Sequence, residues 1–296
     1  MKNPDNRRKE IDIITITGSI VNAALLGLKF FAGFFGHSSA MIADAFHSLS
    51  DFITDIVVLV FMQMAGKPRD TSHDYGHGKF ETLATAVIGF MLFMVGAGIF
   101  RNGAALIWTY LHGAVLEEPG KIAFIMALVS IVSKELLYQW TYISGKKVNS
   151  AAVMANAWHH RSDAFSSIAT AVGIAGAIFL GEKWRVLDPI TACGVGGFII
   201  IIGVRFIKTS FDELLEKSLP YETEEMILSI IRSFPEIHDP HNLRTRRIGS
   251  NIAIEVHIRF NRDTTLESAH AIATLVEDKL KGEFGDGTHV VTHMEC

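Results

Sequence analysis

Long apolar segments separated by short polar loops fill the first 210 residues of the chain. Six of them are long enough to cross about 30 Å of hydrocarbon as helices: residues 11–35, 40–64, 82–108, 121–143, 151–180 and 187–209. The first follows a basic tail, but its apolar stretch is longer than the core of a signal peptide, and further spans follow it. The pattern therefore predicts an α-helical membrane domain with six transmembrane helices over residues 1–210.

Residues 211–296 show the periods of a small soluble domain. Apolar residues between Met226 and Phe234 mark one face of an amphipathic helix, and residues 252–260 alternate as a half-buried strand should. The turn residues 249–251 predict residues 242–248 as the hairpin partner of that strand. A second helix is expected from Leu266 to Leu280 and a third strand over 288–294. The order helix, strand, strand, helix, strand predicts a compact α+β domain with its helices on one sheet face.

Composition and charge narrow the class of protein. Of the 296 residues, 49% are hydrophobic and only 20% are charged, which argues against a wholly soluble protein. Residues 211–296 hold 9 Lys and Arg against 16 Asp and Glu, so this domain is a poor partner for nucleic acid. Lysine and arginine favour the N-terminal tail and the loops at 65–81 and 144–150. The positive-inside rule therefore predicts a multi-pass protein of the cytoplasmic membrane with both termini in the cytoplasm.

Ionisable residues occur within the predicted spans, where each costs several kcal/mol. The second span carries Asp44, His47, Asp51 and Asp55 on one stripe, and the fifth carries His159, His160, Arg161 and Asp163. A buried salt-bridge cluster is one interpretation. A metal site is favoured, because His47 with Asp51 and His159 with Asp163 are pairs four residues apart that together form an N2O2 set suited to Zn²⁺. The two carboxylates would balance the charge of the ion.

Other polar residues of the spans receive structural interpretations. We expect His160 to serve a neighbouring helix or to orient a ligand, since it lies at a different angle from His159. Lys29 is expected to extend toward the membrane surface. Lys134 and Glu135 are interpreted as a pair between helices, without a role in transport.

Three motifs, in this order along the chain, carry a resemblance: Asp44-Ala-Phe-His47-Ser-Leu-Ser-Asp51, Tyr75-Gly76-His77-Gly78-Lys79-Phe80-Glu81 and His159-His160-Arg161-Ser162-Asp163. Together they resemble those of the cation diffusion facilitators, six-span exporters of divalent metals, and in particular their bacterial zinc-transporting members. The resemblance covers essentially the whole chain. It implies a ferredoxin-like, metallochaperone-like fold for the cytoplasmic domain, residues 211–296, which would bind metal and contribute to dimerisation.

The resemblance also implies three metal sites. The transport site falls on His47, Asp51, His159 and Asp163, and a loop site falls on Asp70, His73 and His77. A cytoplasmic site falls on His241, His257, His270, His293 and Glu295. A charge contact across the dimer would fall on Lys79 and Glu216. Glu216 and Glu295 both stand where the family more often has Asp, and Cys296 either joins the last site or is inert.

These features imply a secondary transporter rather than an enzyme. The resemblance implies a homodimer in membrane lipid that exports Zn²⁺ in exchange for protons, with Zn²⁺ also regulatory at the cytoplasmic domain. A membrane metalloprotease is disfavoured because HExxH is absent. A non-transporting metal sensor or assembly scaffold with the same fold remains the alternative. Cadmium, iron and manganese remain alternatives to zinc, and the proton stoichiometry stays open.

Overall fold

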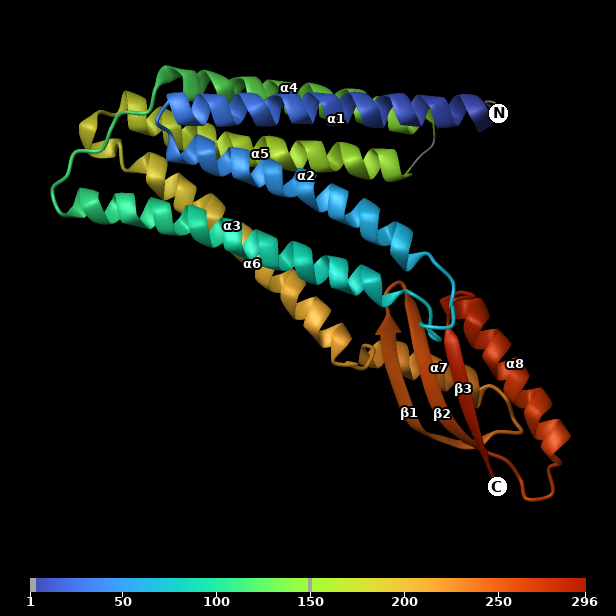
Figure 1. Cartoon of the computed structure of the whole chain (residues 1–296). Helices are drawn as coiled ribbons and strands as arrows, with labels where there is room; N and C mark the ends of the chain where they lie inside the picture. Colours follow the sequence, from blue (N-terminus) through green and yellow to red (C-terminus); the bar gives the residue numbers. More distant parts are fainter. Residues whose placement is uncertain (1–3, 149–150) are drawn as a thin grey trace. The chain divides into compact units, whose positions relative to one another are not determined.

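Six long helices make up most of the first 214 residues (Figure 1). The computed structural model describes residues 4–148 and 151–296, apart from the side chains of residues 4–12, 15, 55, 58, 59, 62, 148, 151, 152 and 155. The helices are α1 (Pro4–Phe35), α2 (Ser39–Ala65), α3 (Lys79–Leu111), α4 (Lys121–Val148), α5 (Ala151–Phe179) and α6 (Leu187–Leu214). Each helix contains one predicted apolar segment, except that α5 ends one residue before its segment does, and several helices extend beyond their segments. A short 3-10 helix (Glu182–Trp184) precedes α6.

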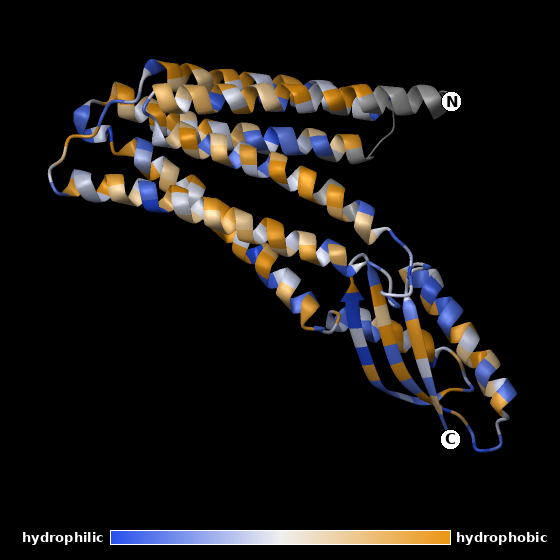
Figure 2. Ribbon diagram, viewed as in Figure 1, coloured by the Kyte–Doolittle hydropathy of each residue, from blue (hydrophilic) through white to orange (hydrophobic). Residues whose placement is uncertain are grey.

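Hydrophobic residues, coloured orange, occur along the length of these helices (Figure 2). Five helical stretches of the described part are long and apolar enough to cross a membrane: Ile16–Phe35, Lys79–Leu111, Lys121–Lys147, Asn156–Phe179 and Glu182–Leu214. α2 has 27 residues, a length of about 40 Å at 1.5 Å per residue. Four of its side chains lie outside the described part, so its role as the sixth span stays a prediction.

The chain divides into two compact units, residues 1–55 with 90–204 and residues 56–89 with 205–296. The second unit therefore joins the ends of α2, α3 and α6 to the soluble domain. The domain boundary predicted after residue 210 is a division by composition and does not coincide with this division by compactness. The division into a membrane domain, residues 1–210, and a cytoplasmic domain, residues 211–296, therefore stays a prediction.

Small residues allow close helix packing in the first unit. α4 packs against α1 and α5, and a buried cluster includes Leu25, Met41, Ala123 and Ile174 from four helices. α3 and α6 cross at glycines, where a Cβ added to Gly96 would lie 2.8 Å from the carbonyl oxygen of Gly196. Close approach at small residues is the usual way in which membrane helices gain packing energy.

The first turn of α2 is held by a carboxylate of α6. Asp188 is 4% exposed and accepts hydrogen bonds of 2.6 Å from the Ser38 hydroxyl and from the backbone N–H of Ser39. A carboxylate is favourable here because the first N–H groups of a helix have no partner within it. This contact ties α2 to α6 in the unit that contains the polar stripe.

The soluble domain has a three-stranded sheet covered by two helices. Its elements are α7 (Tyr221–Arg232), β1 (His238–Ile248), β2 (Asn251–Arg259), α8 (Leu266–Phe284) and β3 (His289–Glu295). The strand order is β1-β2-β3; β1 pairs with β2 antiparallel, and β2 pairs with β3 parallel. α8 makes the crossover that a parallel pair requires. The predicted α+β fold is confirmed.

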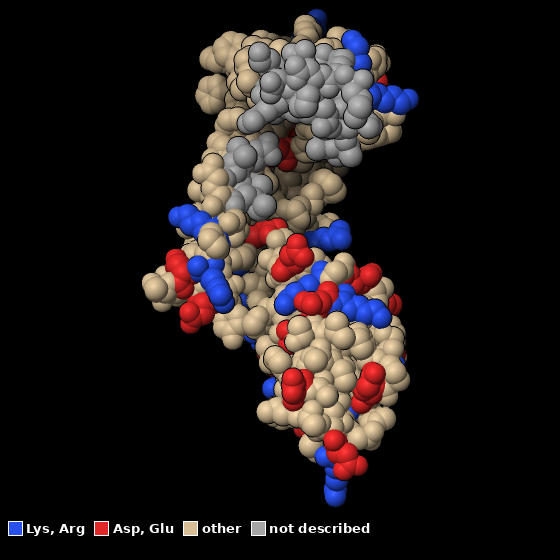
Figure 3. Space-filling view, turned by 90° about the vertical axis from the view of Figure 1, so that its right-hand side faces the viewer, with Lys and Arg blue, Asp and Glu red and all other residues tan. Residues whose placement is uncertain are grey.

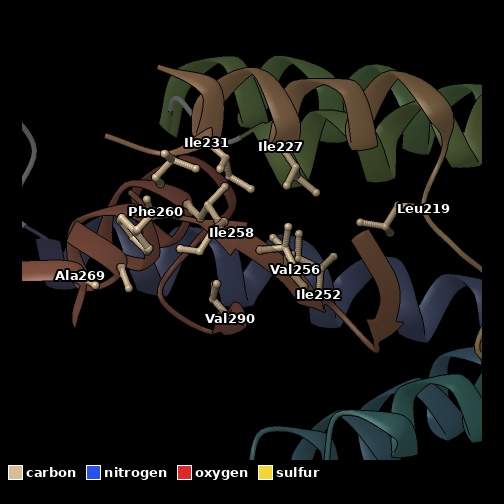
Figure 4. Packing of buried hydrophobic residues seen from close by; sticks show 14 residues of the cluster. Leu219, Ile227, Ile231, Ile252, Val256, Ile258, Phe260, Ala269 and Val290 are labelled. Atoms are coloured by element: carbon tan, nitrogen blue, oxygen red, sulfur yellow. The ribbon is translucent and has the colours of Figure 1, made fainter. Parts of the chain in front are cut away.

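The core of this domain lies between the sheet and its helices. Ile254 and Ile258 of β2 are fully buried with Ile227 and Ile231 of α7 and Leu280 of α8. Figure 4 shows Ile227 and Ile231 on the side of the sheet that carries the buried β2 residues. Figure 3 shows acidic and basic side chains side by side on the surface of the domain. The β2 side chains that do not enter this core lie on the other, polar face of the sheet, where they can bind a ligand.

Candidate metal sites

Three of the four residues predicted for the transport site converge within the first unit. His47 and Asp51 lie one turn apart on α2, and Asp163 projects from α5. One ligand atom from each lies within 4.8 Å of the others, with Asp163 buried and the two α2 side chains half-buried. Two carboxylates and an imidazole at this spacing can hold a divalent metal ion.

His159, the fourth predicted ligand, lies beside this cluster and outside it. Its Nε2 is 3.9 Å from Asp163 Oδ1, and its side chain is 51% exposed. The neighbouring His160 is buried instead, and both of its ring nitrogens lack a hydrogen-bond partner in the described part. His160 Nε2 faces Gly18 of α1, at 3.7 Å from where a Cβ would lie. His160 therefore faces a neighbouring helix.

A lysine that sequence reasoning set aside contacts the cluster directly. Lys134 of α4 places Nζ 2.7 Å from Asp163 Oδ2 and 2.8 Å from Asn22 Oδ1 of α1. Its partner is therefore the predicted metal ligand, and Glu135 is paired with Arg161 instead, at 3.7 Å. The two carboxylates therefore do not balance the charge of an ion as expected, because the Lys134 ammonium already offsets the charge of Asp163. The sequence did contain an indication of this contact, because a lysine in the middle of an apolar span is costly and therefore needs a partner.

Lys29 does not extend to the membrane surface. It is 1% exposed and forms an ion pair of 2.8 Å with Asp44, which is also 1% exposed. Ser48 and Ser167 accept hydrogen bonds from the same ammonium at 3.1 and 3.3 Å. The expectation was wrong because Asp44 supplies a buried counter-charge. Asp44 is therefore paired and lies outside the metal cluster, and the side chain of Asp55 is outside the described part.

A cavity of about 510 Å³ adjoins His47 between α2, α5 and α6. Ser162, Ser166 and Thr191 contribute hydroxyl groups to its lining, and Phe165 and Phe198 contribute aromatic rings. A space of this size with polar groups in its lining is large enough to admit water. His47 is thus the ligand of the cluster that faces an open volume.

The three residues predicted for the loop site lie close together between α2 and α3. His73 Nδ1 lies 3.4 Å from Asp70 Oδ1, and His77 Nε2 lies 3.5 Å from Asp70 Oδ2. The two imidazole rings are 4.2 Å apart between centroids. Hydrogen bonds from the Ser72 hydroxyl and backbone hold the pKa of the Asp70 carboxyl far below its ordinary value, so this ligand stays ionised.

Residues predicted for the cytoplasmic site come together on the polar face of the sheet. Strand pairing places His241 of β1 opposite His257 of β2, which lies opposite His293 of β3. Irregular register on both sides of His241 accompanies positive φ angles at Asp239 and Asn242. The strands thus bring three imidazoles to one level of the sheet.

Glu295 joins these histidines. Its carboxylate lies 2.8 Å from His257 Nδ1 and 3.5 Å from His241 Nε2, and His241, His257 and Glu295 form a mutually close ligand group. His293 Nε2 is 3.9 Å from Glu295 Oε1. His270 of α8 lies outside that group, and Cys296 is exposed. The roles of His270, His293 and Cys296 therefore stay predictions.

Acid should weaken this cluster. Hydrogen bonds from His257 and Arg259 lower the pKa of the Glu295 carboxyl. A lowered pKa stabilises the folded state above the unfolded value of about 4.3, and this contribution is lost as the pH falls through the folded value. We expect Glu295→Gln to lower the thermal midpoint near neutral pH and to differ less from wild type near pH 3. Glu283→Gln on exposed α8 is the control, and a difference independent of pH would contradict the account.

The two residues predicted to make a charge contact across the dimer are paired within one chain. Lys79 at the start of α3 forms an ion pair with Glu216, which also accepts from Arg246 Nε at 3.0 Å. Glu213 accepts a hydrogen bond from the backbone N–H of Gly249 at 2.7 Å and another from Thr82. Glutamate in place of the more usual aspartate thus still reaches its partner. A contact across a dimer stays a prediction.

Comparison with known proteins identifies the family. Residues 15–215 match the model of the cation efflux transmembrane domain, and residues 219–296 match that of the cation efflux protein cytoplasmic domain. The chain belongs to the cation diffusion facilitator family. The two matches meet between residues 215 and 219, close to the change in sequence period.

Relatives of this cation diffusion facilitator include proteins of plants and bacteria. It is 34% identical to metal tolerance protein C1 of Arabidopsis thaliana over 94% of its own length and 61% of that protein's length. It is 31% identical to the manganese efflux system protein MneP of Bacillus subtilis, covering 95% and 94% of the two chains. Identity to the cation-efflux pump FieF of Klebsiella pneumoniae is 29%, covering 95% and 91%.

Family membership defines the coarse activity. Cation efflux proteins are transporters and not enzymes, so this facilitator is a multi-pass membrane protein that exports divalent metal cations. Metal ions are its partners, and its clusters of His, Asp and Glu are the chemistry with which it would bind them.

Proposed function

We propose that the chain is a Zn²⁺/H⁺ antiporter of the cytoplasmic membrane, with His47, Asp51, His159 and Asp163 as its transport site. The observation that carries the proposal is that His47 and Asp51 of α2 and Asp163 of α5 converge, with one ligand atom of each within 4.8 Å of the others. His159 Nε2 lies 3.9 Å from Asp163 Oδ1, and this imidazole would complete the set as its fourth ligand. A closed set of four ligands suits a bound cargo better than a catalytic metal with an open position.

Zinc is the cargo that this donor set supports best. Two imidazoles with two carboxylates suit Zn²⁺, whereas sets of oxygen alone suit harder ions such as Mn²⁺. One relative is named for manganese efflux, so the choice between these two ions is the central comparison. Cadmium and iron are the other ions to compare.

The chemistry of the ligands supports protons as the ions that are exchanged for the metal. Imidazole must be neutral and carboxylate ionised to hold a metal, so metal binding releases protons and protonation expels metal. An ordinary histidine pKa of about 6.5 allows this exchange at cellular pH. The inward proton gradient would then drive the metal outward.

Flux into proteoliposomes tests transport and exchange together. Purified protein is reconstituted with a zinc indicator and a pH indicator inside the vesicles, and Zn²⁺, Cd²⁺, Mn²⁺ and Fe²⁺ are compared. We expect zinc uptake with opposite proton movement, slowing when the metal-loading side falls below about pH 6. Zinc flux unchanged between about pH 5.5 and 7.5 would contradict exchange with protons. No flux of any of the four metals would favour the non-transporting sensor or scaffold.

The cytoplasmic and loop clusters are proposed to regulate the homodimer rather than to carry cargo. Both termini would lie in the cytoplasm, as the loop charges support. Metal bound by the His241, His257 and Glu295 group can bias a conformational equilibrium only through different affinities for its two states. The group would thereby make transport sensitive to the cytoplasmic metal concentration.

The double variant His241→Ala, His257→Ala should separate regulation from transport. We expect at least about tenfold weaker zinc binding at the cytoplasmic domain, because even residues that only orient a ligand contribute that much. The zinc concentration for half-maximal flux should change, while flux at saturating zinc persists. Equilibrium dialysis and the flux assay measure the two effects. His270→Ala is the comparison, and complete loss of flux in the double variant would place these histidines in the transport path.

A further inference from the structure

The proposed transport site contains a cation of its own. Lys134 is 4% exposed in the middle of α4, and its ammonium lies 2.7 Å from Oδ2 of Asp163. Asp163 in turn is one of the three residues whose ligand atoms converge. The ammonium therefore occupies one oxygen of a carboxylate that the metal needs.

A metal ion and this ammonium would compete for the Asp163 carboxylate. A divalent ion among His47, Asp51 and Asp163 would lie within a few ångströms of Nζ, and like charges repel strongly at that range in a poorly solvated interior. A carboxylate has enough lone pairs to accept from both. The repulsion, rather than a lack of acceptor sites, would make the two cations exclude each other.

The ammonium has a second acceptor that does not belong to the site. Asn22 Oδ1 of α1 lies 2.8 Å from Nζ, so a lysine released from Asp163 keeps a hydrogen bond. A buried charge without a partner would be costly. Lys134 avoids this cost when it leaves Asp163, because Asn22 remains its partner. Asn22 thus makes release of Asp163 reversible.

We propose that Lys134 is a tethered competitor of the transported metal, which holds Asp163 while the site is empty and moves toward Asn22 when metal binds. The inference rests on the proposed transport site. In the empty state Asp163 ties α5 to α4, and in the metal-bound state it ties α5 to α2. Lys134 is therefore a positioning residue, and its return to Asp163 assists release of the metal.

A matched control lies in the same unit. Lys29 is as buried as Lys134 and is paired with Asp44 at 2.8 Å, but Asp44 is outside the converging ligand group. Ser167 of α5 contacts both members of this pair and forms a hydrogen bond of 3.0 Å with Ser130 of α4. Removing Lys29 alters a buried ion pair of the same kind without freeing a metal ligand.

Cobalt binding to the full-length protein tests the competition. The background carries His73→Gln and His257→Gln, which disable the loop and cytoplasmic clusters, and Co²⁺ absorbance is titrated at about pH 8, above the ordinary pKa of imidazole. We expect Lys134→Met and Lys134→Gln to bind Co²⁺ at least about tenfold more tightly, the effect of one decade in affinity. Lys134→Arg and Lys29→Met should remain close to the background. Unchanged or weaker binding in both neutral variants of Lys134 would overturn the competition.

Two further measurements separate this inference from the transport site itself. Asp51→Asn in the same background should abolish the cobalt signal, and a signal that survives it would overturn the site and the competition together. In proteoliposomes, Lys134→Gln should lower both KM and kcat for zinc, because binding tightens and release slows. A lower kcat with unchanged KM would indicate a merely structural lysine and overturn the proposal.

Discussion

Replacing Asp51 with asparagine is expected to abolish metal flux while the protein still inserts and dimerises. Asp51 and Asp163 are the two carboxylates of the converging group, and Asp163 is already paired with Lys134. Asp51 is therefore the carboxylate without a lysine bound to it in the described contacts. Without it, the site has no net negative charge with which to attract a divalent ion. Removing even a residue that orients a metal ligand costs tenfold to a hundredfold, so we expect a loss of at least about a hundredfold.

Initial rates of zinc uptake into proteoliposomes measure this loss. Glu135→Gln is the control, because Glu135 lies on α4 and pairs with Arg161 outside the cluster. Size-exclusion chromatography in detergent checks that the variant is folded and keeps its oligomeric state. Near-normal zinc flux through Asp51→Asn would refute the proposed site. Asp163→Ala should also abolish flux, but it additionally deprives buried Lys134 of its counter-charge.

Replacing His47 with aspartate is expected to retain flux and to shift selectivity from zinc toward manganese. The substitution keeps the spacing of four residues from Asp51 but replaces an imidazole with a third carboxylate. The donor set changes from two nitrogens and two oxygens to one nitrogen and three oxygens, which suits harder ions. His47 also faces the adjoining cavity, where its replacement has room. We expect the ratio of zinc to manganese flux to fall by up to about tenfold, equivalent to about 1.4 kcal/mol.

Parallel flux measurements of both metals through wild-type and variant vesicles give this ratio. Affinity for Cd²⁺ should fall with loss of the softer imidazole. His47→Ala is the informative comparison, because it removes the imidazole without adding a carboxylate. A ratio unchanged by His47→Asp would show that selectivity is determined by some other group.

Helix positions and the soluble fold were predictable from the sequence because both depend on short periods. Each apolar segment longer than about 20 residues became a helix, and the alternation of residues 252–260 predicted β2. The spacing of four residues between His47 and Asp51 also predicted that they share one face of α2. In each case the physical cause lies within one element or one turn.

Contacts between helices were decided by the tertiary structure. Lys29 has apolar neighbours in sequence and Lys134 is followed by an acidic residue of its own helix. Neither neighbourhood indicates that Asp44 and Asp163 would meet these lysines from other helices. The same holds for His159 and His270, which match a motif and yet lie outside their clusters in this chain. Successive residues of an α-helix lie about 100° apart around its axis. A rotation of α5 by that angle would exchange His159 and His160, and the sequence does not specify the rotation.

The sequence by itself thus determined a helical membrane domain, an α+β domain and the residue types that can bind metal. Periodicity and hydropathy suffice for this, because burial in lipid or in a core selects residues position by position. Only the tertiary structure decided that Asp163 lies both in the converging group of ligand residues and beside Lys134. A buried ion pair depends on the rotation and depth of two helices, which are set by packing over their whole length rather than by the paired residues.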